Sequence, residues 1–468
     1  MLLKLINTKL TIAIVVITSL CSCNNSMRYD DYSAYFGGEI VNPSERFVLL
    51  LKDNKLIDTL FLNAENRFFK KFDSLTPGLY TFKHLPEYQY VYFDKNDSIM
   101  VRVNSDDFDN SVVYCGRGDE KNNYFMDAFL KNEHNNEVLY GILDKDISEF
   151  NSFTDKAYAS LKKEYDTKKI EYSWSPGFDS IAMAQLQFNY YFTKELYPYA
   201  HQYKTGNEIY DKLPNDFYAF RNTINLNNES FTSFSPFVKY VSMMLTNRVY
   251  EKQHNNYNDM SLNSNIEKLN LTDSIIKNEK IKNGVLNQLA SMYLLEDQNM
   301  KNNTLFIKRY LELSSDEKHQ NEIKDIFTAV QNLVPGKKLP NIELVNTNDE
   351  KVLPEQYFKG EKTVFFFWST MADSHLKAVH NKVKVLQENH PHINFIAVNI
   401  KDTKEAWLNA INKYNFSGIT ELKSTNFSEI QKKWVLNKVH RVIVTNKNGE
   451  IVNGFSNLFD VNFAKNNF

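Results

Sequence analysis

The sequence predicts an α+β protein of several domains, with an N-terminal antiparallel β domain, a central α-helical region and a C-terminal α/β domain. Three observations lead to this prediction. Apolar and polar residues alternate over 35–116, apolar residues recur at helical spacing over 117–334, and strands alternate with helices over 335–468. At about 150 residues per domain, a chain of 468 residues is long enough for roughly three domains.

The charge balance excludes some classes of partner. The chain has 55 basic and 57 acidic residues, so neither nucleic acid nor a strongly acidic ligand is implied as a partner. An aromatic content of 14% with only 14 glycines indicates packed globular structure rather than disorder.

The first 23 residues have the pattern of a processing segment. Lys4 and Lys9 precede an apolar run at 10–20 that has signal-peptide length and is too short to span about 30 Å of hydrocarbon as a helix. The run ends in Leu-Cys-Ser-Cys, which resembles the bacterial lipobox. On this interpretation Cys23 is lipidated, residues 24–34 are a tether, and the rest of the chain folds outside the cytoplasm at an envelope membrane. A plain secretory peptide or an N-terminal anchor is the alternative.

The number of cysteines limits the redox chemistry. The sequence has three cysteines, Cys21, Cys23 and Cys115. If Cys21 is removed with the signal peptide and Cys23 is acylated, Cys115 is the lone thiol and no intramolecular disulfide can form. We expect Cys115 to be a small buried residue rather than a reactive thiol, because only Arg117 nearby in sequence favours a thiolate.

The β domain, 35–116, is predicted from β-branched and aromatic residues with regular turn signals. Asp53 and Asn54 are expected to turn between two strands, and Ile99, Val101 and Val103 are expected to face the core. The aromatic segment 86–93 is interpreted as cross-strand packing, with a ligand platform as the alternative.

The helical region, 117–334, contains several apolar stripes at helical spacing. Asp179 is a plausible cap for one helix, and Ser235 with Pro236 is a good start for another. Further helices are expected at 275–295, 305–313 and 316–334, and the polar stretch 254–265 is expected to be a loop. These stripes are interpreted as core, and the region offers no catalytic candidate.

The last block begins at the break formed by Pro335 and Gly336. An apolar strand at 363–368 leads into a helix with Asp373 or Ser374 as its cap, and a second buried strand follows at 393–400. Asp402 or Thr403 caps the next helix, and a hairpin turns at 446–449. Strand, helix, strand, helix and two antiparallel strands is the order of the thioredoxin fold.

This block resembles the envelope thioredoxin-like proteins of the TlpA/ResA type. Their diagnostic run is phenylalanine, tryptophan, a small residue, threonine, a second tryptophan and then Cys-x-x-Cys. Phe367, Trp368 and the two residues after it match this run, and Met371 replaces the second tryptophan. Segments 339–344 and 445–452 match the flanks of the family. The β and helical blocks resemble, more weakly, the N-terminal extensions of such lipoproteins.

The reactive positions depart from the family pattern. Continuing the run, Ala372 stands at the nucleophilic cysteine and His375 at the resolving cysteine, and the cis-proline position aligns with His440. Disulfide exchange needs a thiolate to attack and a second thiol to resolve the mixed disulfide, and neither position supplies sulfur. The resemblance therefore implies a degenerate site that consists of Trp368, Met371, Ala372, Asp373, His375 and His440.

Two main functions follow from the sequence. The favoured one is a non-enzymatic envelope lipoprotein that needs no cofactor and binds a protein or peptide partner at the degenerate site, or serves as a scaffold. The alternative is an accessory thiol-disulfide oxidoreductase-related protein, in which Cys115 forms a mixed disulfide with a partner. A third, less favoured reading is zinc or copper binding by Asp373, His375 and His440. We expect no metal there, because both histidines also fit structural roles.

Overall fold

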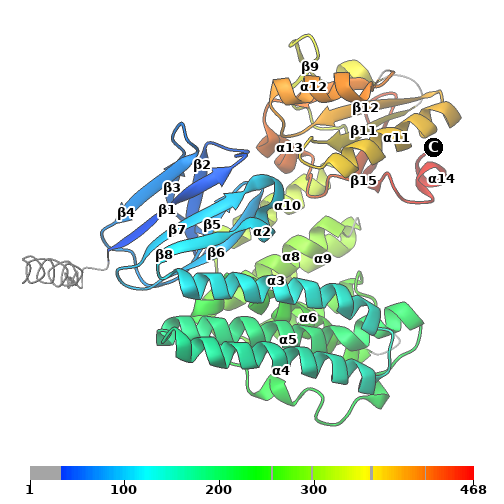
Figure 1. The fold of residues 1–468 in the computed structure, drawn as a ribbon. Coiled ribbons are helices and arrows are strands. Elements are labelled where there is room, and N and C mark those ends of the chain that lie inside the picture. The colour runs from blue at the N-terminus through cyan, green and yellow to red at the C-terminus, as the bar shows by residue number, and fades with distance from the viewer. Residues whose placement is uncertain (1–32, 254–256, 297–298, 359–361, 417) are drawn as a thin grey trace, which may run out of the picture. The chain divides into compact units, whose positions relative to one another are not determined.

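Figure 1 shows the computed structural model of the chain, which describes residues 33–253, 257–296, 299–358, 362–416 and 418–468. The expected signal peptide, Cys23 and nearly all of the expected tether lie outside the described residues. The chain divides into two compact units. Unit 1 comprises the described residues up to Thr193 with Ala200–Glu208, and unit 2 comprises Lys194–Tyr199 with Ile209–Phe468. The division falls within a helix of the central region.

Unit 1 begins with two four-stranded sheets that share one hydrophobic core (Figure 1). One sheet has the order β4-β1-β7-β8 and the other the order β3-β2-β5-β6. The predicted core positions Ile99, Val101 and Val103 are buried, as expected. The strands are β1 (Ala34–Val41), β2 (Phe47–Lys52), β3 (Lys55–Phe61), β4 (Arg67–Phe72), β5 (Gly78–His84), β6 (Glu87–Phe93), β7 (Ser98–Asn104) and β8 (Val113–Arg117).

The strand pairing confirms one expectation and corrects another. Asp53 and Asn54, with φ of 49° and 61°, form the predicted two-residue turn between β2 and β3, where positive φ matches the twist of the hairpin. In contrast, β1 pairs in parallel with β7, so the domain is not purely antiparallel. Parallel neighbours need a long crossover, and here the crossover contains five intervening strands. Alternation in the sequence carries no information about such a distant pairing.

Three long helices complete unit 1: α3 (Asp119–Ile142), α4 (Ile147–Glu171) and α5 (Pro176–Thr205), except that Lys194–Tyr199 of α5 belong to unit 2. The Ser175 hydroxyl caps α5 by accepting from the Phe178 N–H, so the predicted cap at Asp179 is wrong. Proline at the first helical position presets the helix there and leaves the preceding residue as the cap. The Asp179 carboxylate instead accepts hydrogen bonds from Tyr165 and Lys169 of α4.

Unit 2 continues with five helices, and the second of them was not predicted. Residues 262–275 form a helix although 254–265 was expected to be a loop, and the helix expected at 275–295 begins four residues later. The buried face of the unpredicted helix is mostly polar, so it lacks an apolar stripe. The helices are α6 (Ser235–Gln253), α7 (Leu262–Ile275), α8 (Glu279–Glu296), α9 (Met300–Leu313) and α10 (Glu317–Gln331). Nowhere in the described ranges is a helix both long and apolar enough to cross a membrane.

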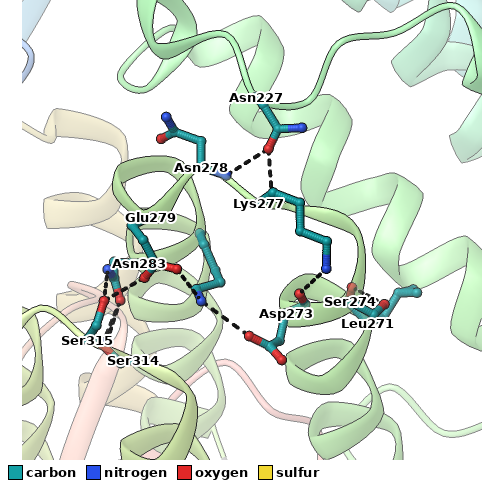
Figure 2. Close-up of polar contacts among 11 residues, drawn as sticks. Asn227, Leu271, Asp273, Ser274, Lys277, Asn278, Glu279, Asn283, Ser314 and Ser315 are labelled. Carbon is teal, nitrogen blue, oxygen red and sulfur yellow. Dashed lines mark hydrogen bonds and ion pairs between the residues drawn. The ribbon is translucent and has the colours of Figure 1, made fainter.

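Polar side chains fix the start of α8, as Figure 2 shows. The side-chain oxygen Oδ1 of Asn227 accepts from the backbone N–H groups of Lys277 and Asn278, at 2.7 and 2.8 Å. One turn into the helix, the side chain of Asn283 exchanges three hydrogen bonds with Ser314 and Ser315, which connect α9 to α10. Asn283 is buried, so these bonds satisfy polar groups that water does not reach.

The last part of unit 2 is a seven-stranded sheet of order β10-β9-β13-β12-β11-β14-β15. The central strand β11 pairs in parallel with β12 and antiparallel with β14. The strands are β9 (Leu344–Asn346), β10 (Lys351–Val352), β11 (Lys362–Trp368), β12 (Ile393–Asn399), β13 (Thr420–Ser424), β14 (Arg441–Asn446) and β15 (Ile451–Asn457), and the helices are α11 (Asp373–Asn389), α12 (Lys404–Tyr414), α13 (Phe427–Lys433) and α14 (Phe463–Asn467).

Both faces of β11 are buried, which explains its continuous apolar sequence. Phe366 and Trp368 belong to a core with the apolar stripe of α11 and with Trp407 of α12. Phe365 and Phe367 belong to the opposite core, with Trp434 after α13. The hairpin turn at Gly449, with φ of 73°, is confirmed. This arrangement brings the carboxyl end of β11 to the start of α11.

Candidate functional site

The candidate site is the loop between β11 and α11. Asp402, in the loop that follows β12, accepts hydrogen bonds from the Ser369 hydroxyl and the Thr370 backbone N–H, both at 2.7 Å. Asn399 in turn donates to the Asp402 carboxylate at 2.6 Å. Of the two predicted caps of α12, Thr403 is the one that is used, and Asp402 instead fixes the loop. The loop is thus held from the neighbouring strand.

The residues at the tip of this loop are accessible to solvent, but their side chains have little chemical reactivity. Met371 is 50% exposed, and Ala372 occupies the N-cap position of α11 without a side-chain hydrogen bond, so neither predicted cap, Asp373 nor Ser374, is used. The Asp373 carboxylate accepts from Lys377 at 2.5 Å and from the Tyr414 hydroxyl at 2.8 Å. These two hydrogen bonds lower the pKa of Asp373 and commit its carboxylate to α11 and α12.

His375 is half-buried and fixed to the sheet. Its Nε2 lies 3.1 Å from the carbonyl oxygen of Phe367, which can only accept, so Nε2 carries the hydrogen. Burial lowers the pKa of His375, that hydrogen bond raises it by less, and the electrostatic influence of His440 and His380 lowers it further. His375 is therefore a neutral imidazole at pH 7 whose Nε2 is already used.

His440 lies just before β14, at the end of a loop that is tightly tied to the sheet. Buried Arg441 donates two hydrogen bonds to the Gly454 carbonyl, at 2.6 and 3.0 Å, and one to the Val435 carbonyl. Val435 has φ of 51°, a left-handed conformation that costs energy for a β-branched residue. His440 thus directly precedes buried Arg441, which is bonded to the strained backbone of Val435.

A buried polar cluster beneath the loop was not found by sequence reasoning. The Glu421 carboxylate of β13 accepts from Trp368 Nε1 at 3.0 Å and lies 3.1 Å from His380 Nε2. His380 also faces the Leu376 carbonyl with Nδ1, at 2.8 Å, and stacks on Phe416 with ring centroids 3.6 Å apart. Since that carbonyl only accepts, Nδ1 carries a hydrogen, and the histidine and carboxylate share one further proton. A glutamate within a short buried strand is a sequence signal for a buried carboxylate, although it does not identify the partner, which lies 41 positions away.

The metal hypothesis gains no support from the geometry. Across the described ranges, no group of three or more His, Cys, Asp or Glu side chains is placed to hold a metal ion. Of the proposed ligands, Asp373 is bound to Lys377 and Tyr414, and His375 is bound to a backbone carbonyl.

The two candidates in the β domain have opposite outcomes. In segment 86–93 the aromatic residues mainly pack: Tyr92 and Phe93 are buried, and Tyr92 contacts Phe178 of α5. Cys115 was expected to be buried, but it is exposed. The phase of β8 explains this, because Tyr114 points into the core and the next side chain must point outward. Across the outer face, Cys115 is paired with Met100 of β7.

Comparison with known proteins defines the class of the C-terminal block. A family model described as thioredoxin-like matches residues 360–451. Together with the strand order around β11, this match identifies the block as a thioredoxin-like domain, as the sequence predicted.

Similar solved structures come from several Bacteroides species. A thioredoxin-like protein from Bacteroides caccae is 13% identical, covers 51% of this chain and 86% of its own, and gives a TM-score of 0.32. A thiol-disulfide oxidoreductase from Bacteroides fragilis is 22% identical over 25% of this chain and 88% of its own, with a TM-score of 0.23. The thioredoxin domain of a thiol-disulfide oxidoreductase from Bacteroides vulgatus is 16% identical over 26% and 87%, with a TM-score of 0.22. At such TM-scores these likenesses carry no argument for an activity. No curated protein matches the chain.

Proposed function

We propose that this protein is an envelope lipoprotein whose thioredoxin-like domain binds a protein or peptide partner without exchanging disulfides. The observation that carries the proposal is the chemistry at the start of α11, where Ala372 and His375 stand in place of two thiols. Ala372 offers no nucleophile, and the His375 ring is neutral and bound to the Phe367 carbonyl. The whole stretch 116–468 contains no cysteine.

Binding is favoured over a purely structural role because the tip is both rigid and accessible. Asp402 binds the Ser369 hydroxyl and the Thr370 backbone N–H, while Met371 is half-exposed beside the N-terminus of a long helix that no side chain caps. A fixed loop loses little conformational entropy when a partner binds. An exposed methionine adds flexible apolar surface that can adapt to a partner side chain.

Disulfide reduction tests the absence of exchange chemistry. The full-length chain in mild detergent is assayed for reduction of a disulfide-bonded test protein at the expense of a small dithiol. We expect no rate above the uncatalysed background. The double variant Ala372→Cys, His375→Cys is the matched control and is expected to gain activity, since it restores both sulfurs. Turnover by the unmodified chain that approaches a working thioredoxin contradicts the proposal.

Site-specific photo-crosslinking tests the binding role. A photoreactive residue replaces Met371 in the membrane-associated protein, and captured molecules are identified by mass spectrometry. The matched control replaces Val385, which is exposed to the same degree, 53% against 50%, but lies toward the end of α11. One dominant partner captured only from position 371 is the expected result. Equal capture from both positions, or none, argues against a binding tip.

The lipid anchor is a separate part of the proposal and rests on the sequence around Cys23. Cells are fed an alkyne fatty acid, and the wild type is compared with Cys23→Ala. We expect label and membrane association in the wild type, and loss of both in the variant. Label retained in Cys23→Ala refutes the lipidation site, and an unlabelled wild type favours the plain secretory or anchor alternative.

A second function is favoured by the exposure of Cys115. Its thiolate can attack a partner disulfide, forming one mixed disulfide and releasing the partner's other sulfur as a thiol. Alkylation of the native protein, followed by non-reducing electrophoresis of the wild type and Cys115→Ser, tests this. The idea requires rapid alkylation and a partner that is released by reductant. It fails if Cys115 is labelled only after unfolding, or if the same adducts form without it.

A further inference from the structure

A pocket lies within unit 1, among the three helices α3, α4 and α5, which run side by side in Figure 1. It contains about 620 Å³ of empty space including its mouth, and the centres of water-sized molecules can occupy about 50 Å³ of it. A single water needs roughly 10–15 Å³ on this measure, so the interior accommodates a small organic molecule. All of its lining residues belong to unit 1.

The lining of this pocket selects against charge. No aspartate, glutamate, lysine, arginine or histidine is among the described residues that line it. An ion inside would lose its hydration without gaining a counter-charge, which costs several kcal/mol. The lining combines apolar side chains with carboxamides, namely Asn132, Asn135, Asn136, Gln185 and Asn189.

Gln185 supplies an unsatisfied acceptor in the wall of the pocket. Its side chain is 4% exposed, and its Nε2 donates to the Phe125 carbonyl at 3.2 Å. Its Oε1 has no hydrogen-bond partner among the described residues. The nearby hydroxyls of Thr154 and Thr193 cannot serve it, because they donate to the carbonyls one turn back in their own helices. A buried amide oxygen of this kind favours an incoming N–H or O–H donor.

An aromatic wall stands beside this acceptor. The rings of Tyr158 and Tyr190 pack with centroids 4.4 Å apart, and the Tyr190 hydroxyl donates to Asp155 at 2.7 Å, which fixes its orientation. Both tyrosines line the pocket, together with Phe153 and Leu161 of α4. A flat apolar ring can pack against such a wall.

We propose that this pocket binds an uncharged small molecule with a flat apolar ring and one hydroxyl or N–H group that donates to Gln185 Oε1. The inference is independent of the thioredoxin-like tip and of the lipid anchor. It assigns a ligand-binding role to the helices of unit 1, a region in which the sequence offered no functional candidate.

Three probes of similar shape test the proposal on the full-length chain. Phenol carries the donor, toluene lacks it, and benzoate replaces it with a charge. Ligand-observed NMR titrations are recorded for the wild type and for Ala157→Phe, which fills the pocket, and the difference between them cancels partition into detergent. We expect phenol to bind about fivefold more tightly than toluene, the value of one ordinary hydrogen bond. Benzoate should bind at least about tenfold more weakly than phenol.

Gln185→Leu removes the acceptor and is expected to reduce the preference for phenol over toluene to about onefold. Circular dichroism checks that each variant is folded, and Ala128→Phe fills the pocket from α3 if Ala157→Phe does not fold. The comparison of the three probes on the wild type needs no variant. Equal binding of phenol and toluene, tight binding of benzoate, binding that persists in the filled pocket, or no binding of any probe overturns the proposal.

Discussion

Replacing Glu421 by leucine should destabilise the thioredoxin-like domain strongly. The change leaves the Trp368 Nε1–H and the His380 Nε2 without their shared partner, and both side chains are at most 3% exposed. An unsatisfied buried polar group costs about 1–3 kcal/mol, so two such groups cost about 2–6 kcal/mol. Removing one member of a buried ion pair generally costs about 3–5 kcal/mol, which lies in the same range.

Glu421→Gln is the matched control because glutamine can satisfy both neighbours. Its Oε1 can accept from Trp368, and its NH₂ group can donate to the unprotonated Nε2 of a neutral His380. We therefore expect a loss of no more than about 1 kcal/mol. Urea unfolding followed by tryptophan fluorescence measures both variants. Three of the four tryptophans, Trp368, Trp407 and Trp434, lie in this domain, so the signal reports mainly on its unfolding.

Two results would refute this reasoning. Equal destabilisation by leucine and glutamine would show that the negative charge, not hydrogen-bond satisfaction, is what the cluster needs. An unchanged free energy of unfolding in Glu421→Leu would show that the pair of Glu421 and His380 contributes nothing to stability. A further check is the double variant Glu421→Leu, His380→Phe, which removes both polar groups and should recover part of the loss.

Three other changes test other parts of the structure. Burial lowers the pKa of His84, while its hydrogen bond to Phe47 and the charge of Glu45 raise that pKa by less. Below the usual histidine pKa of about 6.5, the unfolded state therefore binds more protons at this position than the folded state does. This contribution to the stability of unit 1 is present above that pH and is lost as the pH falls toward the lowered pKa. His84→Gln should therefore flatten the pH dependence of stability, which urea titrations at several pH values measure. Gly454→Ala places a Cβ 2.3 Å from a backbone carbonyl oxygen and should cost about 1–3 kcal/mol of stability. Gly284→Ala lies within a helix, where the new Cβ meets no atom within 4 Å, and should stabilise by up to about 1 kcal/mol. Thermal unfolding shows whether one variant is destabilised and the other stabilised. Asn283→Ala removes three hydrogen bonds, one buried and two partly buried, and should cost about 1–3 kcal/mol in urea unfolding. Asn287→Ala on the same helix should have little effect, and equal costs would show that those bonds are not what fixes α8.

The thioredoxin-like domain could be predicted from the sequence because its signals are local. The apolar run of β11 and the stripe of α11 each lie within one element, and the hairpin turn is marked by Gly449. The pairing of Glu421 with His380 could not be predicted, since the two residues are 41 positions apart and meet only when β13 enters the sheet.

Other parts failed for identifiable physical reasons. Helix α7 buries Ser264, Asn265, Lys268 and Thr272, so its inward face has no apolar periodicity. The burial of Cys115 was predicted from the usual preference of cysteine, whereas the alternation set by Tyr114 determined its side of the strand. Phase within a strand was the better guide than residue type.

The hydrogen bonds that Asp402 accepts have a practical consequence for protein engineering. The Ser369 hydroxyl and the Thr370 backbone N–H both donate to a residue more than thirty positions later in the chain, so the loop is anchored independently of the side chains at 371 and 372. Positions 371 and 372 can therefore be randomised, or replaced by short grafted motifs, while the surrounding sheet keeps its register. The loop is suited to displaying peptide libraries on a fixed frame.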